Sequence, residues 1–189
     1  MLTVLLVEND LDNKALETAI NNDGLDYVKI QYSPLFLSHA KDCRPDVVII
    51  NLDTPTDKQI ADLHTLNQQL PMPVIVFSSD SSSETVNKVI KAEVSALITD
   101  GLPCHRLNGI IQVALARFNH TQMLKTALED ARTQLEDRKQ IDRAKAILIK
   151  TQNFTEDQAY HTLRKLAMDR NITLGEMARN VLAMAELLK

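Results

Sequence analysis

Five short, strongly apolar runs alternate with helix-length segments over the first hundred residues, and this alternation is the strongest constraint on the fold. Three of the runs are almost continuously apolar, which is typical of parallel strands covered on both faces. The expected strands are Leu2–Val7, Tyr27–Tyr32, Asp46–Asn51, Val74–Ser78 and Ala96–Thr99. The repeats predict a doubly wound α/β domain over residues 1–120, with the flavodoxin-like strand order as the default.

The segments between these runs have the apolar spacing of helices that cover a sheet. Asp12–Ile20 places apolar residues at helical intervals, and Pro34 stands where a second helix can start. Two more helices are expected over Thr56–Leu66 and Ser83–Lys91.

The pattern changes after Pro103. From Arg106 to Thr151 there is no proline, and no glycine after Gly109, while small or apolar residues recur at steps of three and four. The stripe consists of Leu107, Ile111, Ala114, Phe118, Thr121, Leu124, Leu128, Ala131 and Leu135. It predicts one long helix with a coiled-coil seam, in which residues 121–137 form a helical linker. The seam is expected to mediate either a homodimer or a contact within the chain. Because several seam residues are small or polar, a weak or asymmetric coil fits as well as a strong zipper.

Two shorter helices are expected to follow. Thr155 and Gln158 form a capping-box pattern, Asn171 is a stop, and Thr173 can cap the last helix. The apolar face of the first helix is Ala159, Leu163 and Ala167, and that of the second is Met177, Val181, Ala185 and Leu188. Neither helix can bury its stripe alone. Both are therefore expected to pack on the end of the long helix, around Ile141, Ala144 and Leu148, as an all-α three-helix domain over residues 138–189.

Charge separates the same two parts. Residues 1–100 carry 7 Lys and Arg against 15 Asp and Glu, whereas residues 101–189 carry 14 against 10. This asymmetry places any polyanionic partner on the rear part. No run approaches the ~20 apolar residues that span a bilayer, and the N-terminus MLTVLLVEND has no basic segment of a signal peptide. A cytoplasmic protein without a membrane partner is expected, with Cys43 and Cys104 as reduced thiols.

Specific motifs connect this organisation to known families. A domain that begins VLLVEND and has a strand ending in NLDTP resembles a response-regulator receiver domain. The segments RKQIDRAKAILI (138–149) and TEDQAYHTLRKLAMDRN (155–171), followed by an apolar helix, resemble the ANTAR antitermination module. SALITDGL (95–102) together with VALARF (113–118) is similar to the NasT branch of NasT/AmiR-like regulators of nitrate assimilation. The resemblance covers nearly the whole chain.

The phosphorylation chemistry of a receiver is degenerate here. By this resemblance, a working receiver has two acids after its first strand for Mg²⁺, an acceptor Asp, a Ser or Thr, and a Lys that binds the new phosphate. In this chain Asn9 replaces an acid, Asn51 takes the acceptor position, and Asp100 replaces the Lys. An amide is a poor nucleophile, and an anion repels phosphate. The positions concerned are Glu8, Asn9, Asn51, Asp53, Ser78 and Asp100, of which Ser78 fits the pattern.

Two interpretations of the remaining acids are open. Asp53 is either a displaced phosphoryl acceptor, with Asp10 rescuing metal binding, or part of a solvated acidic cluster with Glu8. We favour the second, in which the domain is a pseudo-receiver that acts by protein–protein contact. The resemblance implies control by a NasS-like nitrate sensor rather than by a kinase. A phosphorylation-dependent two-component response regulator is the alternative.

The rear part combines cations with an aromatic ring. Tyr160 and Arg164 are four residues apart and share a helix face, which suits unstacked RNA bases and flanking phosphates. The alternative is that these cations are ordinary solvated surface charges and that Tyr160 is half-packed in the core. The ANTAR resemblance instead implies binding to paired stem-loops of a leader RNA. The candidate RNA-binding residues are Arg138, Lys139, Arg143, Lys145, Tyr160, Arg164, Lys165 and Arg170.

Other functions are less consistent with the sequence. A DNA-binding factor that reads a groove with the last helix would have one internal cation there, Arg179. The chain has no Gly-rich phosphate loop, no zinc-ligand spacing and no set of nucleophile, His and acid. We therefore expect no enzymatic activity, no metal site and no cofactor.

Overall fold

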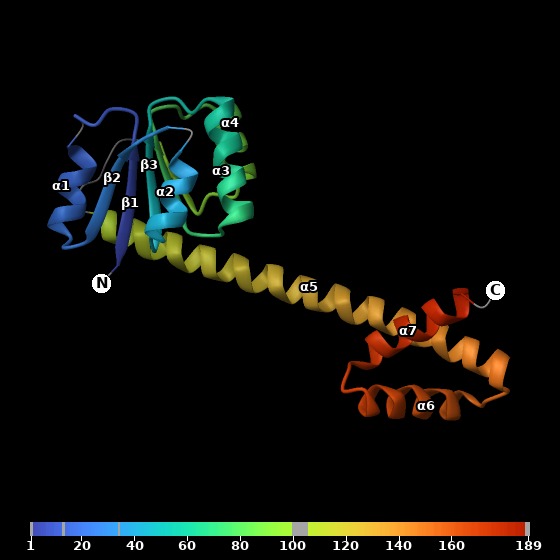
Figure 1. The fold of residues 1–189 in the computed structure, drawn as a ribbon. Coiled ribbons are helices and arrows are strands. Elements are labelled where there is room, and N and C mark those ends of the chain that lie inside the picture. Colours follow the sequence, from blue (N-terminus) through green and yellow to red (C-terminus); the bar gives the residue numbers. More distant parts are fainter. Residues whose placement is uncertain (1, 13, 34, 100–105, 188–189) are drawn as a thin grey trace. The chain divides into compact units, whose positions relative to one another are not determined.

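The computed structural model describes residues 2–12, 14–33, 35–99 and 106–187, and the chain divides into two compact units, Met1–Gln122 and Met123–Lys189. The strands are β1 (Thr3–Glu8), β2 (Asp26–Gln31), β3 (Val47–Leu52), β4 (Val74–Ser78) and β5 (Ala96–Ile98). The helices (Figure 1) are α1 (Ala15–Asn22), α2 (Phe36–Cys43), α3 (Asp57–Gln69), α4 (Ser83–Lys91), α5 (Leu107–Gln152), α6 (Glu156–Asp169) and α7 (Leu174–Leu187). The predicted alternation is confirmed, and every strand bound lies within one residue of its expected position.

The five strands form one parallel sheet in the order β2-β1-β3-β4-β5. This is the flavodoxin-like order expected by default. β1 and β3 are central, and their residues Val4–Val7 and Val47–Ile50 are fully buried. The continuous apolar runs reflect this position, since both faces of a central parallel strand are covered by helices.

Two hydrophobic layers hold helices on the sheet. One layer joins alternate strand residues to α2, α3 and α4 through Phe36, Leu63 and Val89. The other joins the opposite strand faces to α1 and to the first turns of α5 through Leu16, Ile20 and Ile111. Figure 1 shows α1 on the opposite side of the sheet from α2 and α3.

Two helix starts differ from the sequence expectation. α1 begins at Ala15 rather than at Asp12, because the Asp10 side chain accepts the Asp12 N–H (2.9 Å) in a local turn. α2 begins at Phe36, and Pro34 lies outside the described residues.

The long helix is confirmed as α5, but its stripe is not one continuous seam. Leu107, Ile111 and Ala114 are buried against the sheet. By contrast, Leu124, Leu128 and Leu135 remain more than half exposed. Steps of three and four serve a helix that covers a sheet as well as one that lines a coiled coil, so sequence spacing did not separate these two uses. None of the described helices, α5 included, is long and apolar enough to cross a membrane.

The second unit contains the predicted three-helix core. Ala144 of α5 packs with Leu163 and Ala167 of α6 and with Met177 and Ala178 of α7. Both expected N-terminal caps are present. Thr155 and Gln158 form a reciprocal capping box, and the Thr173 hydroxyl and backbone N–H bind the Glu176 carboxylate. As expected, α6 stops before Asn171, which has a left-handed φ of 53°. The stripe of α7 is centred on Met177 and Ala178, and Leu188 lies outside the described residues.

A glycine allows α7 to lie close to α5. A Cβ at Gly175 would come within 2.3 Å of the Asp137 carboxylate on α5. Arg179, one turn further along α7, forms an ion pair with the same carboxylate. The absence of a side chain at Gly175 therefore leaves room for a polar link between the two helices.

Candidate functional site

The carboxyl edge of the sheet brings together three residues of the degenerate phosphorylation pattern. Glu8 ends β1 and is in register with Asn51 of β3, while Leu52 is in register with Ser78 at the end of β4. Parallel strands align their carboxyl ends at one edge, where ligands of this fold class bind. Three of the positions that the receiver resemblance singles out therefore lie at one edge of the sheet.

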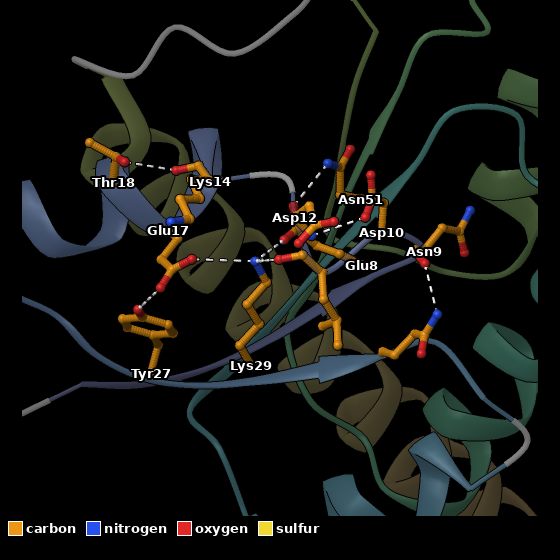
Figure 2. Close-up of polar contacts among 12 residues, drawn as sticks. Glu8, Asn9, Asp10, Asp12, Lys14, Glu17, Thr18, Tyr27, Lys29 and Asn51 are labelled. Atoms are coloured by element: carbon orange, nitrogen blue, oxygen red, sulfur yellow. Dashed lines mark hydrogen bonds and ion pairs between the residues drawn. The ribbon is translucent and has the colours of Figure 1, made fainter.

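Glu8 is the buried acid of this edge, with a side chain that is 1% exposed. Its Oε2 forms an ion pair with the Lys29 ammonium at 3.0 Å, and its Oε1 accepts a hydrogen bond from Asn51 Nδ2 at 3.1 Å. Figure 2 shows Glu8 between these two donors, which come from β2 and β3. Both carboxylate oxygens are thus engaged by groups of the protein.

Lys29 extends this network to α1. Its ammonium donates to the Leu11 carbonyl at 2.8 Å and to Glu17 Oε2 at 3.3 Å, and Glu17 Oε1 accepts the Tyr27 hydroxyl at 2.6 Å. Burial by itself lowers the pKa of Lys29, but the hydrogen bonds with Glu8 and Glu17 outweigh it and raise that pKa. The Tyr27 hydrogen bond, followed by that of Lys29, lowers the pKa of Glu17. Both shifts favour the charged forms of Lys29 and Glu17.

The end of β4 is also closed by internal hydrogen bonds. The Asp53 carbonyl accepts the Ser78 hydroxyl at 3.1 Å and the backbone N–H groups of Ser79 and Asp80 at 3.0 and 3.2 Å. The Ser78 hydroxyl in turn accepts the Asp80 N–H at 3.1 Å. The hydroxyl expected to bind a phosphate is therefore already hydrogen-bonded within the protein.

The remaining candidates at this edge are dispersed. Asn9 is exposed and contacts the amide groups of Gln31 and Gln59, and the side chains of Asp10 and Asp53 are exposed. Asp100 lies outside the described residues. Among the residues that the structure describes, no three His, Cys, Asp or Glu side chains form a group that could hold a metal ion.

Sequence reasoning missed Lys29 and Glu17. A usable signal was present in β2, where side chains alternate between faces, so that Tyr27 and Lys29 share the partly buried face while Val28 is 41% exposed. A lysine facing inward and a valine facing outward indicate that the lysine has a buried partner.

In the second unit, the candidate RNA-binding cations are mostly exposed. Arg138, Lys139 and Arg143 are exposed on α5, as are Arg164 and Lys165 on α6. Arg170 is exposed at the C-terminal cap of α6. These side chains are accessible to a polyanion.

Tyr160 points away from the three-helix core. It is 39% exposed, between the buried residues Ala159 and Leu163 in the same helix turn, and its ring lies 6.0 Å from that of His161 in an edge-to-face arrangement. Because residues four apart share a helix face, Glu156, Tyr160 and Arg164 form one row along α6. An aromatic face beside a guanidinium is thus accessible on this unit.

Lys145 links this row to α5. Its ammonium lies 2.8 Å from Asp142 Oδ1 and 2.9 Å from Glu156 Oε1, and its side chain is 17% exposed. The hydrogen bond with Asp142, and then that with Glu156, raises the pKa of Lys145, while Lys145 lowers the pKa of Asp142. Lys145 is therefore a partly neutralised cation at the junction of α5 with α6.

Comparisons with known proteins agree with this two-part description. Residues 129–182 match the ANTAR domain model. The chain is 27% identical over 139 residues to the transcriptional regulatory protein PdtaR of Mycobacterium tuberculosis, covering 74% of this chain and 68% of that protein. It is 41% identical over 78 residues to the nitrate regulatory protein of Klebsiella oxytoca, covering 41% of this chain but 20% of that protein. The signal receiver domain of a modulated diguanylate cyclase from Desulfovibrio desulfuricans has the same fold, with a TM-score of 0.55 at 18% identity, covering 63% of this chain and 97% of that domain.

Proposed function

We propose that this chain, which joins a receiver-like α/β domain to a C-terminal ANTAR domain, is a transcription antitermination regulator that binds paired stem-loops in a leader RNA. The observation that carries this proposal is the ANTAR match over α5, α6 and α7, the elements that bear the exposed cations and Tyr160. Binding of the paired hairpins would disfavour a terminator hairpin that overlaps them. The protein would act as a regulator and not as an enzyme.

The domains proposed for this activity are a pseudo-receiver over residues 1–120, a helical linker over 121–137 and the RNA-binding part over 138–189. A DNA-reading role for α7 is less well supported. Its cation Arg179 is paired with Asp137, which occupies the guanidinium that would have to reach a base edge.

The test is direct binding followed by transcription. The full-length protein is titrated into a transcript of the leader that precedes a neighbouring operon, and separately into duplex DNA of matched length, at several salt concentrations. We expect preference for the RNA and a steep salt dependence, since each phosphate contact contributes roughly −0.7 to −0.9 to the slope of log K against log salt. Single-round transcription across the terminator should give more read-through with the protein. Preference for the DNA would contradict the proposal.

We further propose that protein–protein contact, rather than phosphorylation, controls the regulator. The support is the amide of Asn51 at the acceptor position, where it donates a hydrogen bond to Glu8. The similarity to a nitrate regulatory protein favours a NasS-like nitrate sensor as the partner. A sensor of this kind would hold or release the protein according to its own ligand.

A homodimer through α5 is the proposed assembly. Leu124, Leu128 and Leu135 have exposed fractions of 58%, 53% and 58%, and they recur at the steps of a two-stranded coil. Seam positions 124, 131 and 138 are each followed by a cation, namely Lys125, Arg132 and Lys139. Seam positions 121, 128 and 135 are each preceded by a neutral residue or His, namely His120, Ala127 and Gln134. In a parallel pair the basic row faces the neutral one, whereas in an antiparallel pair the basic rows face each other. The charges therefore favour a parallel dimer.

A further inference from the structure

The receiver fold implies a divalent cation at the carboxyl edge of the sheet, and the donors of this chain do not fit one. Mg²⁺ requires about six oxygen ligands in octahedral geometry and prefers carboxylates. Among the residues of this edge that the structure describes, Glu8 is the one buried carboxylate, and Asn51 directs its NH₂ group toward it. The position of a receiver's second acid is occupied by Asn9, a neutral amide that is exposed and contacts the amides of Gln31 and Gln59.

The charge of Glu8 is instead balanced by a lysine. An ammonium has three N–H donors, and among the described residues Lys29 Nζ lies 2.8–3.3 Å from the Leu11 carbonyl oxygen, Glu8 Oε2 and Glu17 Oε2. The Lys29 side chain is 13% exposed, so the pair with Glu8 is shielded from water. These partners belong to β1, to the loop after it and to α1, while Lys29 itself comes from β2.

A second potential ligand is occupied as well. The Asp53 carbonyl, which by the receiver resemblance would bind the metal, accepts three donors from Ser78, Ser79 and Asp80. At one end of this edge the Asp53 carbonyl is thus hydrogen-bonded within the chain, and at the other Glu8 is held by the Lys29 ion pair and the Asn51 hydrogen bond.

We propose that Lys29 is a built-in cation that replaces the divalent metal of a receiver, neutralising Glu8 and tying β1, β2 and α1 together without any bound ion. The receiver-like domain is then independent of Mg²⁺ in its stability, and Lys29 together with Asn51 closes the site against metal and phosphoryl groups. This inference does not depend on RNA binding by the ANTAR domain.

The experiment is thermal unfolding of the full-length protein in EDTA, in millimolar MgCl₂, and in NaCl of equal ionic strength. The wild type is expected to have one Tm in all three. Lys29→Met leaves Glu8 buried without its cation and is expected to lower the Tm of the receiver-like domain by several degrees. The matched control is Lys41→Met, an exposed lysine on α2 that donates to Gln69, and its Tm should stay near that of the wild type.

Two further variants separate loss of the ion pair from general misfolding. Lys29→Met combined with Glu8→Gln removes both charges and is expected to recover much of the lost Tm, because no unpaired buried charge remains. Lys29→Met combined with Asn51→Asp restores a second carboxylate and is expected to gain a Mg²⁺-specific rise in Tm. A Mg²⁺-specific rise in the wild type would overturn the proposal. So would a Lys29→Met Tm equal to the wild type, or a Glu8→Gln double variant no more stable than Lys29→Met alone.

Discussion

Asn51 Nδ2 lies 3.1 Å from Glu8 Oε1, so the residue at the phosphoryl-acceptor position is a hydrogen-bond donor to the neighbouring acid. A receiver that is phosphorylated needs the opposite polarity at this position, a carboxylate that attacks phosphorus. The asparagine that replaces the acceptor aspartate therefore has a structural role, since the Asn51 amide donates a hydrogen bond to one of the two oxygens of the buried Glu8 carboxylate.

The first prediction concerns phosphorylation. Incubation with acetyl phosphate and MgCl₂ is expected to leave the intact mass of the wild type unchanged, because Asn51 cannot form an acyl phosphate. Intact-protein mass spectrometry measures this. A stoichiometric adduct that disappears in Asp53→Asn would show that Asp53 is a displaced acceptor and would restore the phosphorylation-dependent alternative.

The second prediction concerns Tyr160. If its exposed ring stacks on an RNA base, Tyr160→Ala should weaken binding to the leader RNA by about 1–3 kcal/mol, with an unchanged salt slope. Tyr160→Phe keeps the ring and should bind almost as the wild type does. Fluorescence anisotropy gives both values, and circular dichroism checks the fold. A loss of affinity that coincides with loss of helix would make Tyr160 a structural residue instead.

The third prediction concerns Lys145 and its partner Glu156, whose side chains lie 2.9 Å apart. Lys145→Ala should weaken binding to RNA and flatten the salt slope by about one phosphate contact. Glu156→Gln, which removes one of the two carboxylates that hold the ammonium, should tighten binding. Lys91→Ala, an exposed cation on α4, is the matched control and should leave the affinity unchanged. An unaltered slope in Lys145→Ala would restrict this lysine to joining α5 to α6.

The fourth prediction concerns the α5 stripe. Changing Leu128 and Leu135 to Gln should convert a dimer to a monomer in analytical ultracentrifugation. In a background with Cys43 and Cys104 changed to Ser, Leu128→Cys should form a disulfide-linked dimer under mild oxidation, because equivalent seam residues meet in a parallel, in-register pair. Sedimentation of the wild type as a monomer, with and without RNA, would contradict the proposed assembly.

The fifth prediction concerns the contact of Gly175 with Asp137. Gly175→Ala should reduce the free energy of unfolding, since the new Cβ would displace the Asp137 carboxylate and disrupt its pair with Arg179. In an Asp137→Ala background the same change should be neutral or stabilising, by at most about 1 kcal/mol of helix propensity. Urea denaturation of the four proteins measures the cycle. The same sign of effect in both backgrounds would exclude the carboxylate as the cause.

Much of the site could be located from sequence because strand ends are local features. The apolar runs that end near Glu8, Asn51 and Ser78 predict that each of these residues lies at or next to a strand end. The partners of these residues could not be found in this way. Lys29 is 21 residues from Glu8 along the chain and meets it only because β2 pairs with β1 in a particular register.

The sequence by itself determined the alternation of strands and helices, the caps at Thr155 and Thr173, and the loss of the acceptor carboxylate. Each depends on neighbouring residues or on the chemistry of one side chain. Only the tertiary structure decided that Leu107 and Ile111 cover the sheet while Leu128 stays exposed. The same holds for the space beside Gly175 that the Asp137 carboxylate fills, and for the ion pair of Lys29 with Glu8. Periodicity specifies that a helix face is apolar or that a strand face is buried, whereas the group that meets this face is set by how distant segments pack.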